Sequence, residues 1–426
     1  MNKRELVAIF FVLSISIVLS AAMFLGIYFY FSRDISDNDS PVIPVNTDEV
    51  DKGVNENTSQ GSTEATDYAL KADEEIDLDR SIRFTDENME IVIRSKINKP
   101  IGEIYVREIH NITELELNHY NITNITPLSD FTSLEKLHLG GNNITDITPL
   151  NKLSDLKQLT LNDNNITNIS PLVNLIKLDN LDLNGNKITD ISPLTNLRDL
   201  KQLDLRGNKI TNISPLANLR QLQELHISGN NIPNISPLTD LTNLEKLSIM
   251  FGNIRDINAL SNLRELKELD LSRNSITNIN ALSKLTKLEK LGLNRNNIGD
   301  ITPLRNLINL KSLGLNNNNI RDIGALSNLI RLEELFLDQN NITNISALAR
   351  LTRLSRLSLA RNNITNINSL SNLTGLRELY LERNNITNIN ALSNLTRLEG
   401  LSLIANNIED FDPLDNLPHI DKGRYQ

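Results

Sequence analysis

Apolar residues recur along this chain with a period of 22 residues, and the pattern first reads cleanly from Leu134 to Asp155. Shifted by 22, the sequence matches itself without a gap from Ile112 to His419, a stretch that holds fourteen copies. Each copy has seven apolar positions, and all ninety-eight positions carry apolar residues. In the second copy these are Leu134, Leu137, Leu139, Ile144, Ile147, Leu150 and Leu153. Such regularity predicts one elongated stack of repeats rather than several globular domains.

Within each copy a short segment alternates with period two. Leu137 and Leu139 stand between the polar or small residues Lys136, His138 and Gly140. This alternation predicts a short strand with its leucines inward. We therefore expect the copies to stack as parallel strands.

Asparagine stands three residues after the second strand leucine in twelve of the fourteen copies, and only Tyr120 and Gly252 break the column. An amide both donates and accepts hydrogen bonds, so a stacked column can satisfy the turn backbone of neighbouring copies. The sequence predicts an asparagine ladder made of Asn142, Asn164, Asn186, Asn208, Asn230, Asn274, Asn296, Asn318, Asn340, Asn362, Asn384 and Asn406.

A second polar column precedes the second isoleucine and is Asn or Asp in all fourteen copies, as at Asp146. Two residues later comes a small polar residue, often followed by proline, as in Thr148-Pro149. A capping residue before a proline predicts a short helix or 3₁₀ turn, on the side opposite the strand. The expected fold is an α/β solenoid with a parallel sheet on the concave face and 3₁₀ or short helices on the convex face.

Residues 80–111 precede the repeats and follow a different pattern. Thr85 or Asp86 is placed to cap a helix whose apolar residues, from Met89 to Ile97, have helical spacing, and Pro100 ends it. Because the end of a stacked core is apolar, we expect this segment to form an N-terminal helical cap.

The repeat columns resemble the leucine-rich repeats of the internalin family, bacterial surface proteins built from L-x-x-L-x-L-x-x-N-x-I-x-D-I-x-P-L-x-x-L units. The resemblance covers about three quarters of the chain, and residues 80–111 look like the cap of the same family. It implies a horseshoe or arc that binds a protein or a glycan on its concave face and has no enzymatic activity.

The N-terminal residues predict a membrane location. Residues 6–31 contain no charged side chain, and a helix over this segment is long enough to cross a bilayer. Lys3 and Arg4 precede it and favour a head on the cytoplasmic side. A cleaved signal peptide is the alternative, because Ser20-Ala21-Ala22 could serve as a cleavage site. The expected order is a cytoplasmic head (1–5), an anchor or signal (6–31), an acidic disordered linker (32–79), the cap (80–111), the repeats (112–419) and a tail (420–426).

Composition narrows the chemistry. Cysteine is absent, which excludes disulfides and thiolate metal sites. The formal net charge is −10, much of it in the acidic linker, and no basic field predicts nucleic-acid binding. No cofactor or metal site is expected. The expected protein is a single-pass membrane protein with extracytoplasmic repeats, or a secreted one if the helix is cleaved.

The seventh copy departs from the others at Gly252, where the ladder asparagine is missing, and the preceding Met250 and Phe251 are apolar. The pair is either a drifted copy whose ring folds over its own loop or an anchor for a binding partner.

A second candidate anchor lies further along the array. Phe336 and Tyr380 are expected to face outward two strands apart, with Ser358 between them and Arg361 and Arg383 beside them. Aromatic residues and arginines dominate the energetics of many interfaces, although isolated surface aromatics are also ordinary.

Two other functions compete with binding. Asp204, His226 and Ser248 fall in one outward column on successive strands and are the residue set of a hydrolase triad. The expected face is open to water and no oxyanion hole is indicated, so we do not expect catalysis. The other alternative is an intracellular scaffold resembling the phosphatase-1 regulatory subunit, which has 22-residue repeats; the uncharged segment 6–31 argues against it.

Overall fold

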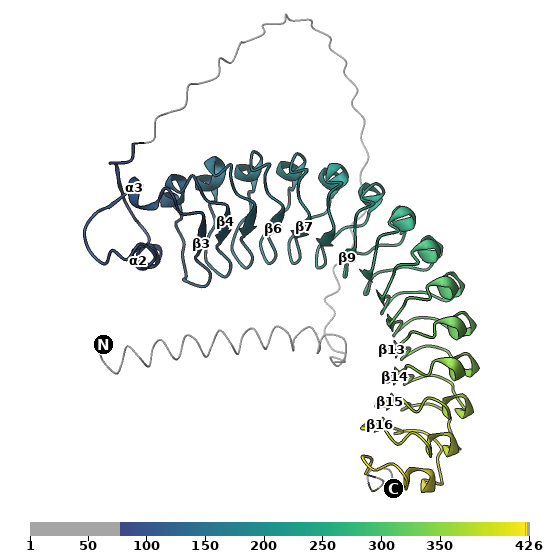
Figure 1. The fold of residues 1–426 in the computed structure, drawn as a ribbon. Helices are drawn as coiled ribbons and strands as arrows, with labels where there is room; N and C mark the ends of the chain where they lie inside the picture. Colours follow the sequence, from purple (N-terminus) through teal and green to yellow (C-terminus); the bar gives the residue numbers. More distant parts are fainter. Residues whose placement is uncertain (1–76, 422, 424–426) are drawn as a thin grey trace, which may run out of the picture. The chain divides into compact units, whose positions relative to one another are not determined.

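The computed structural model describes residues 77–421 and 423. Within them, one parallel sheet of fourteen strands runs in chain order from β3 to β16 (Figure 1). The strands are β3 (Glu114–Glu116), β4 (Lys136–His138), β5 (Gln158–Thr160), β6 (Asn180–Asp182), β7 (Gln202–Asp204), β8 (Glu224–His226), β9 (Lys246–Ser248), β10 (Glu268–Asp270), β11 (Lys290–Gly292), β12 (Ser312–Gly314), β13 (Glu334–Phe336), β14 (Arg356–Ser358), β15 (Glu378–Tyr380) and β16 (Gly400–Ser402).

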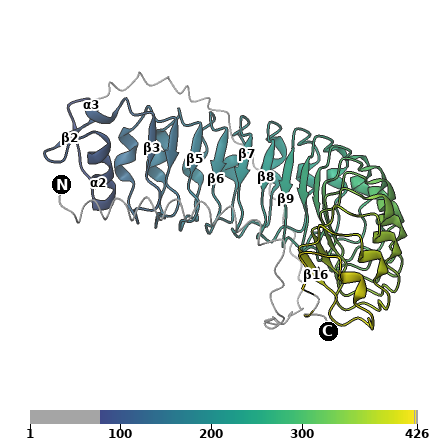
Figure 2. The same cartoon turned by 60° about the horizontal axis from the view of Figure 1, so that its bottom comes forward.

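A 3₁₀ helix follows each strand and lies on the opposite side of the repeat (Figures 1 and 2). The stack of repeats is curved: the strands line its inner side, and the 3₁₀ helices line its outer side. The 3₁₀ helices are η1 (Thr126–Asp130), η2 (Thr148–Lys152), η3 (Ser170–Leu172), η4 (Ser192–Leu194), η5 (Ser214–Asn218), η6 (Ser236–Leu238), η7 (Asn258–Asn262), η8 (Asn280–Lys284), η9 (Thr302–Asn306), η10 (Gly324–Asn328), η11 (Ser346–Arg350), η12 (Asn368–Leu370), η13 (Asn390–Leu392) and η14 (Asp412–Leu414).

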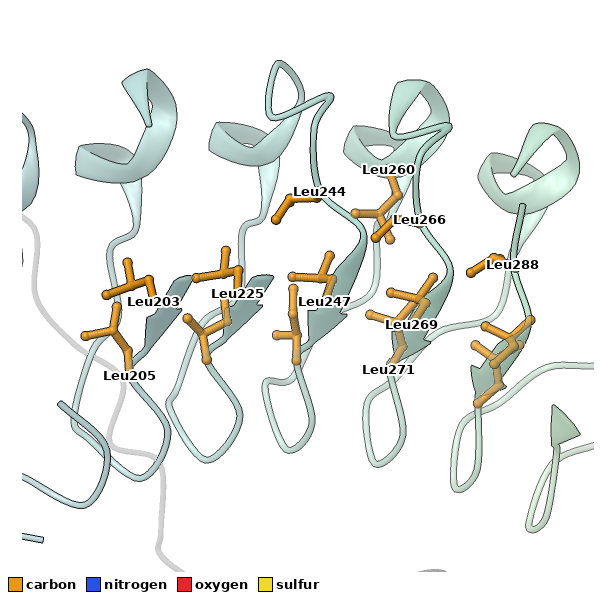
Figure 3. Close-up of a cluster of buried hydrophobic side chains, with 14 of the residues drawn as sticks. Leu203, Leu205, Leu225, Leu244, Leu247, Leu260, Leu266, Leu269, Leu271 and Leu288 are labelled. Atoms are coloured by element: carbon orange, nitrogen blue, oxygen red, sulfur yellow. The ribbon is translucent and has the colours of Figure 1, made fainter. Parts of the chain in front are cut away.

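The strand register repeats the sequence period. Leu203 pairs with Leu225 and Leu225 with Leu247, so each strand leucine lies beside its counterpart one copy away. Figure 3 shows these leucines following one another through the interior between the strands and the 3₁₀ helices. The predicted solenoid is confirmed. The buried leucines and isoleucines form one continuous core, so neighbouring copies bury each other's apolar positions.

The asparagine column lies inside the turn that follows each strand. The Asn142 amide donates to the carbonyls of Leu117 (2.7 Å) and Leu139 (3.0 Å), and its oxygen accepts from the Ile122 N–H (3.0 Å). Equivalent bonds recur with the period of the repeat, as at Asn164. The side chain therefore satisfies buried backbone groups of its own copy and of the preceding copy.

The start of each 3₁₀ helix differs from our expectation. We expected the residue before proline, such as Thr148, to supply the cap. Instead the Asp146 carboxylate two residues earlier accepts from the Thr148 N–H at 2.8 Å, and Thr148 is already the first residue of η2. The Asn or Asp column is thus the acceptor, because an Asx side chain reaches the backbone N–H two residues on.

The segment before the repeats contains β1 (Ser81–Ile82), α2 (Glu87–Lys96), β2 (Ile104–Tyr105) and α3 (Val106–Ile109). Met89 and Ile93 of α2 are fully buried. Asp86 is the N-cap of α2: one carboxylate oxygen accepts from the Met89 N–H (3.1 Å), and the other accepts from the Thr123 N–H of the first copy (2.8 Å). One carboxylate therefore ties α2 to the repeat array.

The two ends of the array are buried to different extents. In the first copy only Ile112, of its seven apolar positions, is partly exposed. In the last copy Leu401, Ile408 and Phe411 are partly exposed. The α2 end is therefore covered better than the β16 end within the described residues.

The predicted head, the apolar helix over 6–31 and nearly all of the linker over 32–79 lie outside the described residues. Among residues 77–421 and 423, no helix has the length and apolar character needed to cross a membrane.

Candidate functional site

The residue that follows each sheet strand by three positions adopts a left-handed backbone conformation. The row runs along one edge of the sheet, and we call it the turn row. Its members are His119, Gly141, Asp163, Gly185, Gly207, Gly229, Phe251, Arg273, Arg295, Asn317, Gln339, Arg361, Arg383 and Ala405. The sequence carried a signal for this geometry in the glycines at 141, 185, 207 and 229, because glycine is the residue that enters this region without strain. We did not infer it from sequence.

Phe251 is an exposed aromatic residue of the turn row, with 43% of its surface accessible at φ 59°. The Arg273 guanidinium, in the next copy, lies 4.8 Å from the ring centroid. Met250 is half-buried, and its N–H donates to the Ser228 hydroxyl (2.9 Å). Of the two predicted apolar residues, Phe251 is therefore the one displayed to solvent.

A hollow of about 580 Å³ lies beside the Phe251 ring. The hollow is formed by the two preceding copies, where Gly229 contributes no side chain, whereas Arg273 belongs to the following copy. The ring thus separates a cation from an open space. The lining residues are Asn208, Lys209, Thr211, Gly229, Asn230, Asn231 and Phe251.

The backbone around Phe251 reflects the missing ladder side chain. The Asn274 side-chain oxygen accepts from both the Gly252 N–H (3.0 Å) and the Ile254 N–H (3.0 Å). The Phe251 N–H points between two carbonyls of the next copy, those of Ser272 (3.4 Å) and Arg273 (3.1 Å). The seventh copy therefore has its own turn geometry.

The second predicted anchor is only partly displayed. Phe336 is 9% exposed, so our expectation of an outward-facing anchor at this position was wrong. Its neighbours in register are Gly314 and Ser358. Tyr380 is half-buried and its hydroxyl donates to Glu378 (3.1 Å). Burial, together with the negative charge of Glu378, raises the pKa of Tyr380.

The two predicted anchors lie in different copies of the repeat and do not form one site. Phe251 follows β9, whereas Phe336 and Tyr380 lie on β13 and β15. Arg361 and Arg383 are exposed members of the turn row in consecutive copies. They belong to the same row as Phe251 rather than to the strand column of Tyr380.

Asp204, His226 and Ser248 are neighbours in register but do not form a hydrogen-bonded triad. The Asp204 carboxylate pairs with Arg206 at 2.5 Å, and the Ser248 hydroxyl lies 2.8 Å from that of Ser228.

No hydrogen bond joins His226 to either residue in the part of the chain that the structure describes. Burial lowers the pKa of His226, although the nearby Asp204 opposes that shift. No group of histidine and acidic residues within residues 77–421 and 423 is placed to hold a metal ion.

Some outward polar residues serve the fold instead. The Asp182, Asp204 and Asp270 carboxylates each accept from a backbone N–H two residues on, at 2.9 to 3.0 Å. In other copies the preceding copy supplies the acceptor, as when Asn294 accepts from the Asn316 N–H (2.9 Å). Sequence reasoning missed this second set of backbone partners.

Charged residues just before the strands alternate in sign from copy to copy. Lys157 pairs with Glu135 (2.9 Å), as one example. The same spacing gives Lys267–Glu245 (2.7 Å) and Lys311–Glu289 (2.6 Å). These pairs are exposed and contribute little stability, but they neutralise this part of the surface.

Comparison with known proteins agrees with the geometry. The family model described as leucine-rich repeats (two copies) matches residues 110–152, 132–174, 176–218, 220–262, 264–306, 308–350 and 374–416. A crystal structure of an internalin (inlF) from Listeria monocytogenes is 33% identical with a TM-score of 0.68, and the match covers 79% of this chain and 94% of that one. The chain belongs to the leucine-rich-repeat family and is internalin-like.

Two further structures have the same fold. The functional domain of InlJ, also from Listeria monocytogenes, is 25% identical with a TM-score of 0.68, covering 79% of this chain and 77% of that one. The plant peptide hormone receptor RGFR1, solved in complex with RGF2, is 26% identical with a TM-score of 0.62, covering 70% of this chain and 52% of that one. No curated protein sequence matches this internalin-like chain.

Proposed function

We propose that this chain is a non-enzymatic binding module, displayed outside the cytoplasm on a helix over residues 6–31, that recognises a protein partner through outward residues of its sheet and turn row. The observation that carries the proposal is Phe251. Its ring is 43% exposed beside a hollow of about 580 Å³, at a position that glycine fills in four other copies. The repeat fold does not require an aromatic ring there.

The relatives support a protein ligand over a glycan. The plant peptide hormone receptor RGFR1, which has the same fold, was solved in complex with RGF2. A preformed array needs little ordering on binding, which favours recognition of a partner by a rigid surface. Exposed aromatic residues next to arginines, such as Phe251 with Arg273, are common interface anchors.

The proposed location rests on the uncharged stretch over residues 6–31 and on the surface location that the internalin resemblance implies. Protease added to intact cells should digest the repeats before lysis. After alkaline washing the protein should stay in the membrane fraction, since such a wash removes charge-held proteins but not a spanning helix. Repeats that survive until lysis would contradict the proposed location, and a soluble form beginning near Met23 would replace the anchor with a signal peptide.

The binding role is tested by cross-linking the full chain to its neighbours on intact cells and identifying what is captured. We expect capture of a protein partner that is reduced by Phe251→Ala and unchanged by Ser248→Ala. Turnover of a captured substrate that is lost in Ser248→Ala would favour the hydrolase alternative instead.

A further inference from the structure

Phenylalanine or arginine occupies five turn-row positions where the fold needs only glycine. A left-handed conformation is costly for any residue with a Cβ atom, and a bulky residue there is an outlier. Four copies satisfy the same turn with glycine, at φ between 61° and 71°. These five residues, at φ between 54° and 59°, are Phe251, Arg273, Arg295, Arg361 and Arg383. Glycine would form the same turn without backbone strain, so strained residues kept at these positions point to a functional surface.

Two arginines of this row differ from the other charges along the sheet. Lysines that precede the strands pair with glutamates one copy away, as Lys267 does with Glu245 at 2.7 Å. Arg361 and Arg383 are exposed, and neither side chain forms an ion pair with another residue in the described ranges. Arg361 and Arg383 therefore present positive charge that the array does not neutralise.

Two carboxylates in the same part of the array are turned at least partly away from solvent. Asp338 accepts from the Ser358 hydroxyl (2.5 Å) and from the Ala360 N–H (2.8 Å). One carboxylate oxygen of Glu382 is buried. Asp338 therefore holds part of the fold.

The first member of the row adds an apolar element. The Phe251 ring has Arg273 on one side and the hollow on the other, and Lys209 lines that hollow. An apolar side chain laid over this shallow hollow would contact the Phe251 ring, and a neighbouring carboxylate would lie close to Lys209. Guanidinium groups suit carboxylates especially well, because both are planar and can form two parallel hydrogen bonds.

We propose that the turn row from Phe251 to Arg383 is the docking surface for an acidic protein segment that carries an apolar side chain. The apolar side chain lies against Phe251, and the carboxylates meet Arg361 and Arg383. This inference rests on the proposed function, since it names the chemistry of the partner that the binding module recognises.

The test uses the full chain and a short fluorescent peptide of glutamates around one phenylalanine, with binding followed by fluorescence anisotropy. We expect binding at ~0.1 M salt and its loss at ~1 M salt, where charges are screened over a much shorter distance. The same peptide with lysines in place of glutamates should not bind, and the glutamate peptide with alanine in place of phenylalanine should bind more weakly.

The decisive variant is Arg361→Gly with Arg383→Gly, because glycine suits the left-handed turn and the protein should still fold. We expect at least ~tenfold weaker binding of the glutamate peptide with an unchanged or higher melting temperature. The matched control is Arg198→Thr with Arg264→Thr, which removes the same charge from exposed positions on the 3₁₀ side, where Thr242 and Thr286 stand in other copies. The control should bind as wild type.

Two results would overturn the inference. If the lysine peptide or a single-stranded DNA of equal charge binds as tightly as the glutamate peptide, the row does not select an acidic protein segment. If the glycine double variant and the control bind equally, the row is not the docking surface. Should the cell-surface cross-linking still capture a partner through Phe251, the proposed function would stand while this inference failed.

Discussion

The guanidinium of Arg273 stacks on the ring of Phe251, with its central carbon 4.8 Å from the ring centroid. Both residues occupy the same turn position in consecutive copies, so the repeat itself places them one strand spacing apart, about 4.8 Å. A cation–π contact of this exposed kind contributes about 0.5 to 1 kcal/mol. It holds the ring in one orientation and reduces the freedom that the ring would lose when a partner binds.

The first prediction concerns the cost of that ring to the fold. Phe251→Gly should leave the free energy of unfolding unchanged or raise it by up to about 1 kcal/mol, because glycine removes left-handed strain. Urea denaturation of the full chain measures this. Phe251→Ala is the matched control, since it also deletes the ring but keeps a Cβ atom. A loss of stability in the glycine variant would mean that the ring serves the fold.

The second prediction concerns the gap in the ladder at Gly252. Gly252→Asn should raise the free energy of unfolding by about 1 to 3 kcal/mol, because the new amide can reach the backbone groups that the other ladder asparagines bind. A Cβ atom at Gly252 would lie 3.2 Å from the Asn274 side-chain oxygen, so a small shift there suffices. Gly252→Ala, which adds the Cβ atom alone, is the control. Equal melting temperatures for the two variants would show that the ladder bonds do not form.

The third prediction concerns Asp182, on β6. Burial, together with the negative charge of Asp204, raises its pKa from 3.8 to about 6, and the hydrogen bond from the Asn184 N–H only partly opposes this. The folded state therefore holds the proton more tightly than the unfolded state does. Stability is lost as the pH rises from about 4 to about 6 and stays lost above.

Asp182→Asn removes this titration and keeps an acceptor for the Asn184 N–H. The variant should gain about 1 to 2 kcal/mol over wild type at pH 7, after allowing for partial solvent screening. The gain should shrink toward zero near pH 4. Urea denaturation across this range measures it, with the exposed Asp199→Asn as control. A gain that does not vary with pH would show that the carboxyl is not the cause.

The fourth prediction concerns Asp86, which joins α2 to the first copy. Burial alone would raise its pKa, but hydrogen bonds from the N–H groups of Thr123, Met89 and Asn124 and from the Thr123 hydroxyl lower it below 3.8. The charged carboxylate thus stabilises the fold above the unfolded pKa of about 4, and that contribution is lost as the pH falls through the folded pKa.

Asp86→Asn should therefore lower the free energy of unfolding at pH 7 by about 1 to 3 kcal/mol, with the deficit shrinking below about pH 4. Hydrogen exchange should show α2 opening before the repeats. Asp155→Asn, which breaks an exposed pair with Lys177, should have little effect. If both variants behave alike, α2 is not held to the array through Asp86.

The repeat architecture could be predicted because its causes are local and periodic. Leu137 and Leu139 face inward by strand alternation alone, and one copy fixes the environment of the next. The asparagine column followed from the same argument, since an amide at Asn142 has both donors and acceptors for the turn. Each strand pairs with the strand of the next copy along the chain, so no pairing between distant segments had to be predicted.

The errors have physical reasons of their own. Thr148 was taken as a cap because the choice between two adjacent polar columns depends on backbone geometry, which places the Asp146 oxygen nearer. Phe336 was taken as exposed because alternation gives the side of the sheet that a residue faces but not how far its neighbours cover it. The left-handed turn row was missed because phenylalanine and arginine, as at Phe251 and Arg273, rarely adopt this conformation and so do not predict it.

The central claim is that the partner binds the inner side of the array, with Phe251 and Tyr380 as contact residues, rather than the 3₁₀ side. The most direct measurement compares partner capture by the full chain, by Phe251→Ala, by Tyr380→Ala and by Lys152→Glu at the end of η2. We predict at least ~tenfold weaker capture for each aromatic variant without a lower melting temperature, and wild-type capture for Lys152→Glu. Wild-type capture by both aromatic variants together with its loss in Lys152→Glu would contradict the account.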